Sequence, residues 1–365
     1  MTRPATVGID ASRLNVGQRT GTETYTAELL AAMAELTPPE DVVLYLNAAT
    51  PPADLPALGR PRCIPFPRLW THVRLSAEML RRRPDVLFVP AHVVPLVAPC
   101  CVVTIHDLGY LSEPDAHPPR QRRMLDLTTR WSARSSTRII AVSDSTKRDL
   151  VDHYGVVPDK IDVVPLGVSE TFSTRSLDET TRVRIAYDLP ETFVLAVGTI
   201  QPRKNLEMLT RAMELIPGIQ LVVAGKPGWL ADRVMAELAE PLRAGRVRLL
   251  GYVPSADLAA LYAASSCVAF VSRFEGFGLP AIEAMACGAP VVASDRGALP
   301  EVVGDAALVV DPDDRNEIAE AIRTVLSDAA RAASLREAGL RRAEEFTWRA
   351  TAEETLRVLR EVAAG

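Results

Sequence analysis

Short apolar runs alternate with amphipathic helical segments along the whole chain. Runs of the strand type fall at residues 6–10, 42–46, 85–90, 101–105 and 138–143 in the first half. In the second half they fall at residues 193–198, 219–225, 247–253, 267–272, 290–295 and 306–311. Helical segments lie between them, for example residues 23–36, 206–216 and 317–328. This alternation predicts an α/β fold with parallel sheets covered on both faces.

The number of predicted strands indicates two domains. One open sheet rarely holds so many strands, so two doubly wound, Rossmann-like domains fit better. A polar stretch with turn formers, residues 169–184, lies near the midpoint and is interpreted as the linker region. We therefore expect domains over residues 1–175 and 176–347. A TIM barrel is the alternative, but the glycine turn after Ser272 favours the doubly wound fold.

Composition narrows the class of protein. The chain has 365 residues, is 48% hydrophobic and carries a net charge of −5, so nucleic acid is not expected as its main partner. Five cysteines without metal-ligand spacing favour a reduced, cytoplasmic setting. No signal peptide is expected from the first residues. Pro90, Pro95 and Pro99 interrupt the apolar stretch 86–105, which predicts two buried strands and a loop rather than a membrane span.

A glycine-rich turn leads into a predicted helix in the second half. Residues 274–288 read FEGFGLPAIEAMACG, which predicts a turn and then a helix with Pro280 in its first position. The cap position is Gly278 or Leu279, and neither side chain accepts a hydrogen bond. The first N–H groups of the helix, with its dipole, therefore make a site for phosphate oxygens. A plain turn with a water-capped helix is the alternative.

Two carboxylates, Glu275 and Glu283, flank the same turn. An ionised carboxylate only accepts hydrogen bonds, and adjacent sugar hydroxyls are natural donors to it. A ligand with a sugar on each side of a diphosphate needs N–H donors in its middle and carboxylates at its ends. The pattern therefore predicts a nucleotide sugar as the ligand. The alternative is that one glutamate complements the helix dipole while the other is a surface residue.

A diphosphate also requires cations, and residues 197–205 supply candidates. Arg203 and Lys204 stand there before Asn205, a good N-cap residue. Arginine can bind two phosphate oxygens at once, and lysine acts as a point charge. Two basic residues in a loop are most often only solvated. At the carboxyl end of a parallel strand in the same predicted domain, however, we expect them to bind the ligand.

These motifs resemble glycosyltransferase family 4, the retaining sugar-nucleotide transferases of the GT-B fold. Glu275 and Glu283 match the family's E-x7-E signature, and residues 198–205 match its G-x-x-x-P-R-K-N element. The segment 251–265, GYVPSADLAALYAAS, and the N-terminal IDASR and TIHDL segments complete the match. The resemblance implies two Rossmann-like domains facing a central cleft, the first for the acceptor and the second for the nucleotide sugar. It also implies that the last helix, residues 348–365, packs back on the first domain.

The resemblance implies roles for individual residues. Arg203 and Lys204 would hold the diphosphate. Glu283 would bind the ribose hydroxyls, and Glu275, in the catalytic set, the hydroxyls of the transferred sugar. The other expected donor-binding positions are Gly21, Val253, Gly276, Phe277, Gly278 and Leu279. Gly21 is the weakest of them, because many relatives carry a second glycine in this loop and this chain reads Gly21-Thr22-Glu23.

His106 follows a predicted strand and corresponds to the family's residue that faces the donor sugar; a core histidine bonded to backbone is the alternative. The resemblance implies retention through same-face attack, in which the departing phosphate helps to deprotonate the acceptor and His106 positions the sugar.

No metal or other cofactor is expected, since Arg203 and Lys204 supply positive charge. Asp311 and Asp313 form a D-x-D pattern of the kind that holds a metal in some glycosyltransferases, but the acidic run 311–314 stands just before a predicted helix and is interpreted as helix-capping acids.

The sequence leaves the identity of the sugar donor and of the acceptor open. The donor is expected to be a GDP- or UDP-linked hexose, with mannose or glucose as candidates, and the acceptor a hydroxyl of a glycan, glycolipid or natural product. A scaffold that binds nucleotide sugars without transferring them is the alternative function. A nicotinamide-dependent oxidoreductase is disfavoured, because Ala281 stands where G-x-G-x-x-G requires its third glycine.

A basic segment surrounds Trp131, with arginines at Arg120, Arg122, Arg123, Arg130 and Arg134. With the arginines at 81–83, it would fit an anionic membrane or a phosphorylated acceptor. A solvated helix face is the favoured alternative. We therefore expect a cytoplasmic protein and leave peripheral contact with the inner face of the membrane open.

Overall fold

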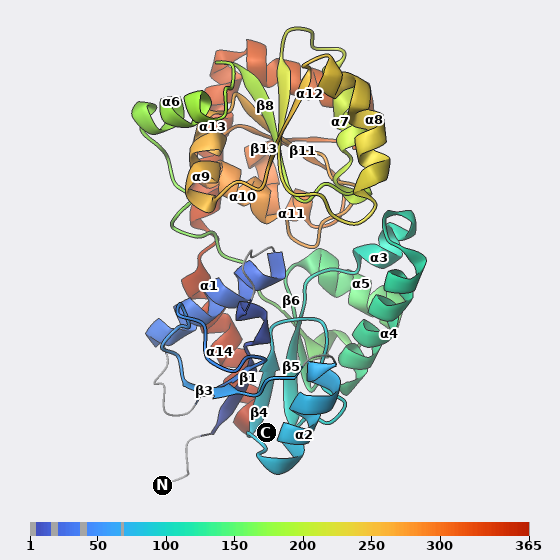
Figure 1. Ribbon diagram of the computed structural model, residues 1–365, viewed down its shortest axis with the longest axis vertical. Helices are drawn as coiled ribbons and strands as arrows, with labels where there is room; N and C mark the ends of the chain where they lie inside the picture. The colour runs from blue at the N-terminus through green and yellow to red at the C-terminus, as the bar shows by residue number, and fades with distance from the viewer. Residues whose placement is uncertain (1–4, 16–20, 37–41, 67–68, 365) are drawn as a thin grey trace. The chain divides into compact units, whose positions relative to one another are not determined.

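The computed structural model describes residues 5–15, 21–36, 42–66 and 69–364, which form two compact units (Figure 1). The first unit comprises residues 1–108, 123–167 and 347–365, and the second residues 109–122 and 168–346. Each unit is built on a parallel sheet with helices on both faces. All the strands expected from the apolar runs are present.

The first unit contains, among the described residues, a seven-stranded sheet in the order β3-β2-β1-β4-β5-β6-β7. Its strands are β1 (Val7–Asp10), β2 (Val42–Leu46), β3 (Arg60–Cys63), β4 (Val86–Val89), β5 (Cys100–Ile105), β6 (Arg138–Ala141) and β7 (Ile161–Val163). The edge strands β3 and β7 were not predicted, because they are short and only partly buried. The interpretation of residues 86–105 as two strands and a loop is confirmed. No described helix is long and apolar enough to cross a membrane.

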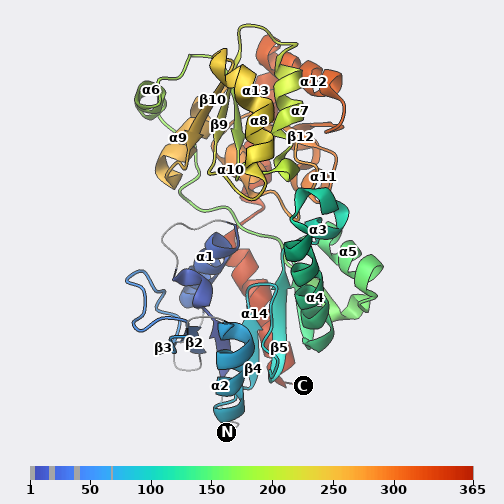
Figure 2. The same ribbon diagram turned by 45° about the vertical axis from the view of Figure 1, so that its right-hand side comes forward.

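Helices cover both faces of the first sheet. α1 (Gly21–Leu36) packs on α14 (Trp348–Ala364), which covers β4, β5 and β6. α4 (Pro119–Ser135) and α5 (Asp144–Tyr154) lie on the opposite face (Figure 2). The shorter helical turns of the first unit are η1 (Ser12–Leu14), η3 (Trp70–Leu75), α2 (Ser76–Arg81) and η5 (Pro158–Lys160). The turns α3 (Gly109–Ser112) and η4 (Pro114–Ala116) belong to the second unit.

The second unit contains, among the described residues, a six-stranded sheet in the order β10-β9-β8-β11-β12-β13. Its strands are β8 (Phe193–Val197), β9 (Gln220–Ala224), β10 (Val247–Gly251), β11 (Cys267–Phe270), β12 (Val291–Ser294) and β13 (Ala307–Val310). Their buried valines, leucines and alanines form the core with helices on each side. This is the arrangement that continuous apolar runs predict.

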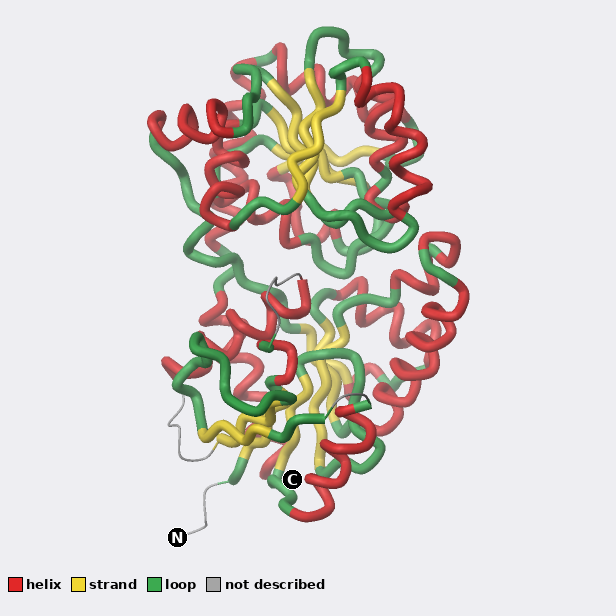
Figure 3. Tube along the Cα trace, viewed as in Figure 1, coloured by secondary structure: helices red, strands yellow, loops and turns green. Residues whose placement is uncertain are grey.

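The helices of the second unit form one layer on each face of the yellow sheet in Figure 3. One layer consists of α7 (Leu206–Met213), α8 (Ala231–Arg243) and α12 (Arg315–Ser327). The other consists of α9 (Ser255–Ala264), α10 (Leu279–Ala286) and α13 (Ala329–Glu344). The remaining elements are η6 (Pro202–Lys204), α11 (Leu299–Val303), η7 (Gly304–Ala306) and α6 (Leu177–Ala186).

The helix α6 begins within residues 169–184, which the sequence predicted as the linker region without a helix of its own. Ser176 and Glu179 form a reciprocal capping box that begins the helix. Leu177 and Ile185 are 76% and 75% exposed, so the helix has no apolar stripe to predict it. The S-x-x-E spacing was the available signal.

Candidate functional site

The candidate site lies where the strand order of the second sheet reverses. From β8, the chain adds β9 and β10 on one side and then β11 to β13 on the other. In open α/β sheets, ligands bind outside the carboxyl ends of the strands at such a switch point. The turn after β8 carries Arg203 and Lys204, and the turn after β11 carries Glu275. The fold therefore brings the two predicted motifs to one edge of one sheet.

Arg203 and Lys204 converge on a single carboxylate. Nη1 of Arg203 donates to Oε2 of Glu275 at 2.8 Å, and Nζ of Lys204 donates to Oε1 at 2.6 Å. The three side chains are only 13%, 12% and 9% exposed. The sequence predicted ligand contacts for each of these residues separately, but no pattern in it indicated that they would form one ion cluster.

The charges in this cluster set the ionisation of Glu275. Burial alone would raise the pKa of Glu275, but the charges of Arg203 and Lys204 outweigh burial and hold this pKa below its usual 4.5. Glu275 is therefore ionised at neutral pH and only accepts hydrogen bonds. Within the cluster, two cationic side chains pair with one carboxylate. The positive charge of Arg203 also acts on the carboxyl group of Glu113.

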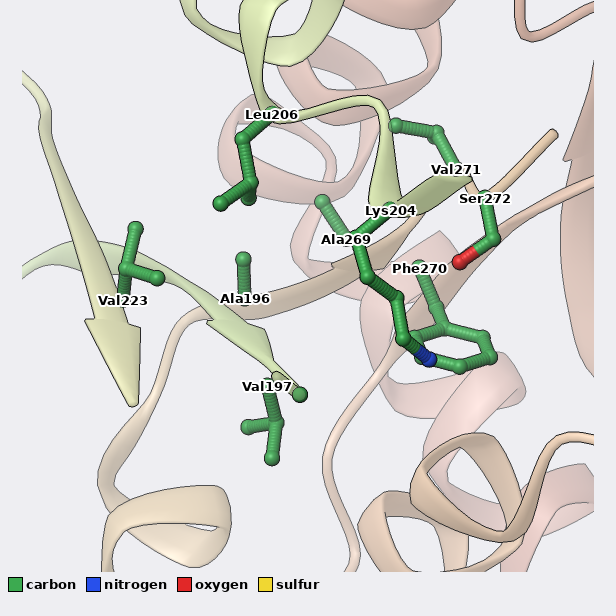
Figure 4. Close-up of a pocket in the computed structure, with 10 residues that line it drawn as sticks. Ala196, Val197, Lys204, Leu206, Val223, Ala269, Phe270, Val271 and Ser272 are labelled. Atoms are coloured by element: carbon green, nitrogen blue, oxygen red, sulfur yellow. The ribbon is translucent and has the colours of Figure 1, made fainter. Parts of the chain in front are cut away.

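The place of Lys204 depends on a glycine and an aromatic ring. Its Nζ lies 4.7 Å from the centroid of the Phe270 ring, a cation–π distance. A Cβ on Gly198 would lie 2.9 Å from Cε of Lys204, so only glycine leaves room for the lysine stem. Figure 4 shows Lys204 and Phe270 beside Val197 and Ser272 in a small pocket at the ends of β8 and β11.

The backbone of Glu275 is fixed by the loop after β12. The N–H of Ala298 donates to the carbonyl oxygen of Glu275 at 2.9 Å. Gly297, with φ 61°, lies so close that a Cβ would be 2.4 Å from that oxygen. A side chain at position 297 would therefore displace the segment that carries the carboxylate.

Asn205 takes the predicted N-cap position of α7 but does not cap it with its side chain. Its backbone is left-handed, with φ 57°, and Nδ2 donates to the carbonyl oxygens of Val271 at 3.1 Å and Pro312 at 2.7 Å. The predicted capping role was wrong, because this fully buried amide instead ties the Arg203–Lys204 turn to two neighbouring loops.

We expect Asn205→Ala to lower the free energy of unfolding of the second unit by about 2–4 kcal/mol, because two buried carbonyl oxygens lose their donor. Urea denaturation measures this effect. Asn316→Ala is the control: this asparagine is exposed in the same unit, and its loss should change stability by less than about 0.5 kcal/mol. Equal effects of the two substitutions would contradict the bridging role.

The helix α10 begins without a side-chain cap, as predicted. Gly278, with φ 107°, occupies the N-cap position, and Leu279 is the first helical residue. Pro280 therefore stands in the second helical position and not the first. Phe277 packs edge-on against Phe346 with ring centroids 5.6 Å apart, while Gly276 is buried. Pro280 has no N–H, and the N–H of Ala281 donates to the carbonyl oxygen of Gly278 at 2.9 Å, so the first turn of α10 offers an anion fewer donors than the sequence predicted.

Glu283 lies on α10 and is oriented by a residue that the sequence did not single out. The hydroxyl of Tyr262 on α9 donates to Oε2 of Glu283 at 3.1 Å. Tyr262 is fully buried and packs against Phe172. Burial first, and then the charge of Glu283, raise the pKa of Tyr262 well above 10, so the phenol stays a donor. Val253, expected near the base, follows β10 and is buried.

In the first unit, His106 follows β5 and contacts backbone. Its Nε2 lies 3.1 Å from the carbonyl oxygen of Pro90; since a carbonyl only accepts, Nε2 carries the proton and Nδ1 is an acceptor in the neutral ring. The ring lies 4.6 Å from that of Tyr25 and 5.4 Å from that of His92. Burial first, and then proximity to His92, lower the pKa of His106 to about 4.

We expect the first unit to lose stability as the pH falls from 6.5 towards 4. In this window the unfolded chain protonates His106 while the folded chain, with a pKa of about 4, does not, so acid favours unfolding. The His106→Asn variant should lack this pH dependence, which amounts to on the order of 2 kcal/mol of unfolding free energy. Denaturation at a series of pH values measures it. An unchanged pH profile would show that His106 is not held neutral.

Gly21 begins α1, and a Cβ on it would meet nothing within 4 Å. None of the described residues therefore requires glycine at this position. The neighbouring Glu23 lies 3.7 Å from Nη1 of Arg13.

The acidic run after β13 caps a helix, as predicted. Asp314 accepts hydrogen bonds from the N–H groups of Asn316 and Glu317 and begins α12. Asp311 pairs with Arg296 and Asp313 with Arg273. In the part of the chain that the structure describes, no group of three or more His, Cys, Asp or Glu side chains is placed to hold a metal ion.

Two family models match this chain, one in each half of the sequence. The family model described as Glycosyltransferase Family 4 matches residues 19–172, and the model Glycosyl transferases group 1 matches residues 178–342. O-antigen chain mannosyltransferase B of Escherichia coli is 35% identical over 284 residues, which cover 76% of this chain and 74% of that protein. This chain belongs to glycosyltransferase family 4.

A second relative is similar in sequence, and solved structures share the fold. D-inositol 3-phosphate glycosyltransferase of Rhodococcus opacus is 36% identical over 255 residues, 67% of this chain and 56% of that protein. Sucrose-phosphate synthase from Thermosynechococcus elongatus superposes with a TM-score of 0.81 at 23% identity, covering 99% of this chain and 100% of that chain. Anabaena HepE, solved with UDP-glucose, superposes with a TM-score of 0.75 at 19% sequence identity, and the superposition covers 97% of this chain and 99% of that chain. The predicted GT-B fold is confirmed.

In this family 4 glycosyltransferase, the turn that carries Arg203 and Lys204 and the turn that carries Glu275 lie together at the switch point of the second sheet, while the IDASR and TIHDL segments belong to the first unit. The prediction of a glycosyltransferase is confirmed. Retention and metal independence stay predictions. The ligand contacts assigned to individual residues, among them Gly21, Val253 and Leu279, stay predictions.

Proposed function

We propose that this family 4 enzyme transfers a hexose, with retention of configuration, from a nucleoside-diphosphate sugar to a hydroxyl of a glycan, glycolipid or natural product. One observation carries the proposal: Arg203, Lys204 and Glu275 form a buried cluster of two cations and one carboxylate at the switch point, in the same unit as the start of α10, which has no side-chain cap. A diphosphate between two sugars matches this combination of cations, N–H donors and a carboxylate.

In this proposal Arg203 and Lys204 bind the diphosphate through charge-assisted hydrogen bonds, and Glu275 then accepts hydrogen bonds from hydroxyls of the transferred sugar. Glu283, oriented by Tyr262, accepts from the ribose hydroxyls. His106 retains its predicted role of positioning the sugar through its acceptor Nδ1. The pairing of Glu275 with both cations supports the proposal, because it preorganises their positions before the ligand binds.

The chemical step breaks the bond between the anomeric carbon and the diphosphate oxygen and forms one from that carbon to the acceptor oxygen. The acceptor proton passes to the departing phosphate on the same face of the sugar. Negative charge grows on the diphosphate as the bond breaks, so Arg203, Lys204 and the start of α10 stabilise the transition state more than the ground state.

Mannose is the favoured hexose, because the mannosyltransferase of Escherichia coli is 35% identical. A panel of GDP-mannose, GDP-glucose, UDP-glucose and UDP-galactose tests the donor: the true donor should raise the melting temperature most, since a ligand of the folded state stabilises it by mass action. Transfer of mannose from the donor to a hydroxyl acceptor is then assayed, and the anomeric configuration of the product tests retention. If no nucleotide sugar stabilises the protein, the proposal fails.

We expect transfer activity to be unchanged in EDTA. Arg203 and Lys204 supply the positive charge that a bound divalent cation provides in metal-dependent transferases, and Asp311 and Asp313 are engaged by Arg296 and Arg273. Initial rates with and without chelator, then with added Mn²⁺, measure the effect. Loss of activity that Mn²⁺ restores would overturn the metal-independent mechanism.

A further inference from the structure

The packing of α4 is inverted relative to an ordinary surface helix. Its buried residues are small or polar: Thr129, Ser132 and Ala133. Its large apolar residues face outward, with Met124, Leu127 and Trp131 at 58%, 61% and 41% exposure. These three recur at spacings of three and four, so they form one stripe along the helix. A helix that only had to fold would place such side chains inward, so the stripe requires another explanation.

Arginines border the apolar residues of α4. Arg123 and Arg134 are exposed and share the face of Met124, Leu127 and Trp131 by helical spacing. We call these five residues the α4 stripe. The one acidic residue from 116 to 143 is Asp126, which lies off the stripe.

Asp126 does not neutralise the stripe, because its partners lie elsewhere. It accepts from the hydroxyl of Tyr154 at 2.8 Å and pairs with Arg130 at 3.4 Å. The guanidinium of Arg130 also lies over the Tyr154 ring. The stripe therefore combines apolar and cationic side chains without an anion of its own.

Exposed apolar and basic residues also occur on two segments of the first unit that neighbour α4. The loop between β4 and β5 is bonded to α4 and to α2, because the N–H of Val94 donates to Ser132 and that of Val97 donates to Ser76. Leu96 in this loop is 57% exposed. At the end of α2, Leu80 is 72% exposed and is followed by three exposed arginines at 81–83. Exposed apolar and basic residues thus occur on three neighbouring segments of the first unit.

We propose that the α4 stripe docks this enzyme on the surface of an anionic lipid bilayer, an inference that goes beyond the proposed transfer reaction. An interfacial helix presents Trp and Leu to the acyl boundary and arginines to lipid phosphates. Trp131 supplies an apolar ring with one N–H, which suits the headgroup region. Trp, Met and Arg are also enriched at protein interfaces, but the excess of like charge favours lipid: one acidic residue stands between positions 116 and 143, and three more exposed arginines lie at 81–83. α4 lies along the surface and does not cross it.

Vesicle flotation of the full chain tests the docking. Phosphatidylcholine vesicles that contain phosphatidylglycerol should carry the protein, pure phosphatidylcholine vesicles should carry much less, and high salt should release it. Leu127→Glu with Trp131→Glu should weaken partition by about tenfold or more. Arg123→Glu with Arg134→Glu should remove the preference for anionic vesicles while leaving the weak neutral binding.

A matched control comes from α6, where Leu177 and Ile185 are also exposed and apolar. Leu177→Glu with Ile185→Glu should leave flotation unchanged. Melting temperature and nucleotide-sugar binding of each variant confirm folding independently of the proposed reaction. The inference is overturned if the control weakens flotation as much as the α4 variants, if anionic lipid makes no difference, or if the α4 variants instead dissociate a dimer in sedimentation while the wild type never floats.

Discussion

Replacing Lys204 with methionine is expected to lower the rate of sugar transfer by about 10²–10³-fold, the usual cost of removing one preorganised donor from a developing negative charge. Methionine retains the apolar stem that passes over Gly198 and faces the Phe270 ring, so the fold should be preserved. Glu275 keeps Arg203 as its partner in the variant. The loss should therefore appear mainly in kcat, because the missing charge acts on the departing diphosphate.

Initial rates and nucleoside-diphosphate affinity of the Lys204→Met variant measure this. Arg211→Ala is the matched control: Arg211 is a basic residue of α7 in the same unit, 52% exposed and paired with Glu237. Its loss should change the rate less than twofold, as expected for a solvated charge. If Lys204→Met and Arg211→Ala have similar rates, Lys204 does not stabilise the leaving group.

Glu275→Gln should separate the two parts of the donor site. The substitution removes the carboxylate that accepts sugar hydroxyls, so we expect transfer to fall by about 10²-fold or more. It also leaves Arg203 and Lys204 without their anionic partner, so affinity for the nucleoside diphosphate alone should stay the same or rise. Calorimetric titration with the diphosphate and with the whole sugar nucleotide distinguishes the two effects.

The same variant should be less stable, by about 3 kcal/mol, because two cations with low exposure lose their partner. The depressed pKa of Glu275 adds a pH dependence: its stabilisation is present above the unfolded value near 4.5 and is lost as the pH falls through the lower folded value. Glu275→Gln should lack this acid-sensitive component. Glu237→Gln, which breaks an exposed pair, is the control for stability. Equal loss of diphosphate and sugar-nucleotide binding in Glu275→Gln would contradict the proposed division of roles.

The fold was predictable where burial alone decides the local structure. The central strands of both sheets are continuous apolar runs, so the sequence pattern predicts strands such as β5 and β11. The edge strand β3 reads Arg-Pro-Arg-Cys and depends on pairing with β2, which no local pattern records. The helix α6 is held by its capping box and packing on α9, again without an apolar stripe.

The sequence predicted which residues form the candidate site, but not which of them contact one another. Charge and position at strand ends pointed to Arg203, Lys204 and Glu275 individually. Their convergence depends on β8 and β11 being neighbours, although two other strands separate them in the chain. The bridge from Asn205 and the hydrogen bond from Tyr262 to Glu283 are tertiary contacts between residues that have ordinary local roles as well.

Gly297 approaches the main chain of Glu275 closely. A side chain at position 297 of this chain must therefore shift the acidic turn, and with it the carboxylate that pairs with Arg203 and Lys204. A position without a functional group of its own thus controls where the charged groups of the cluster stand.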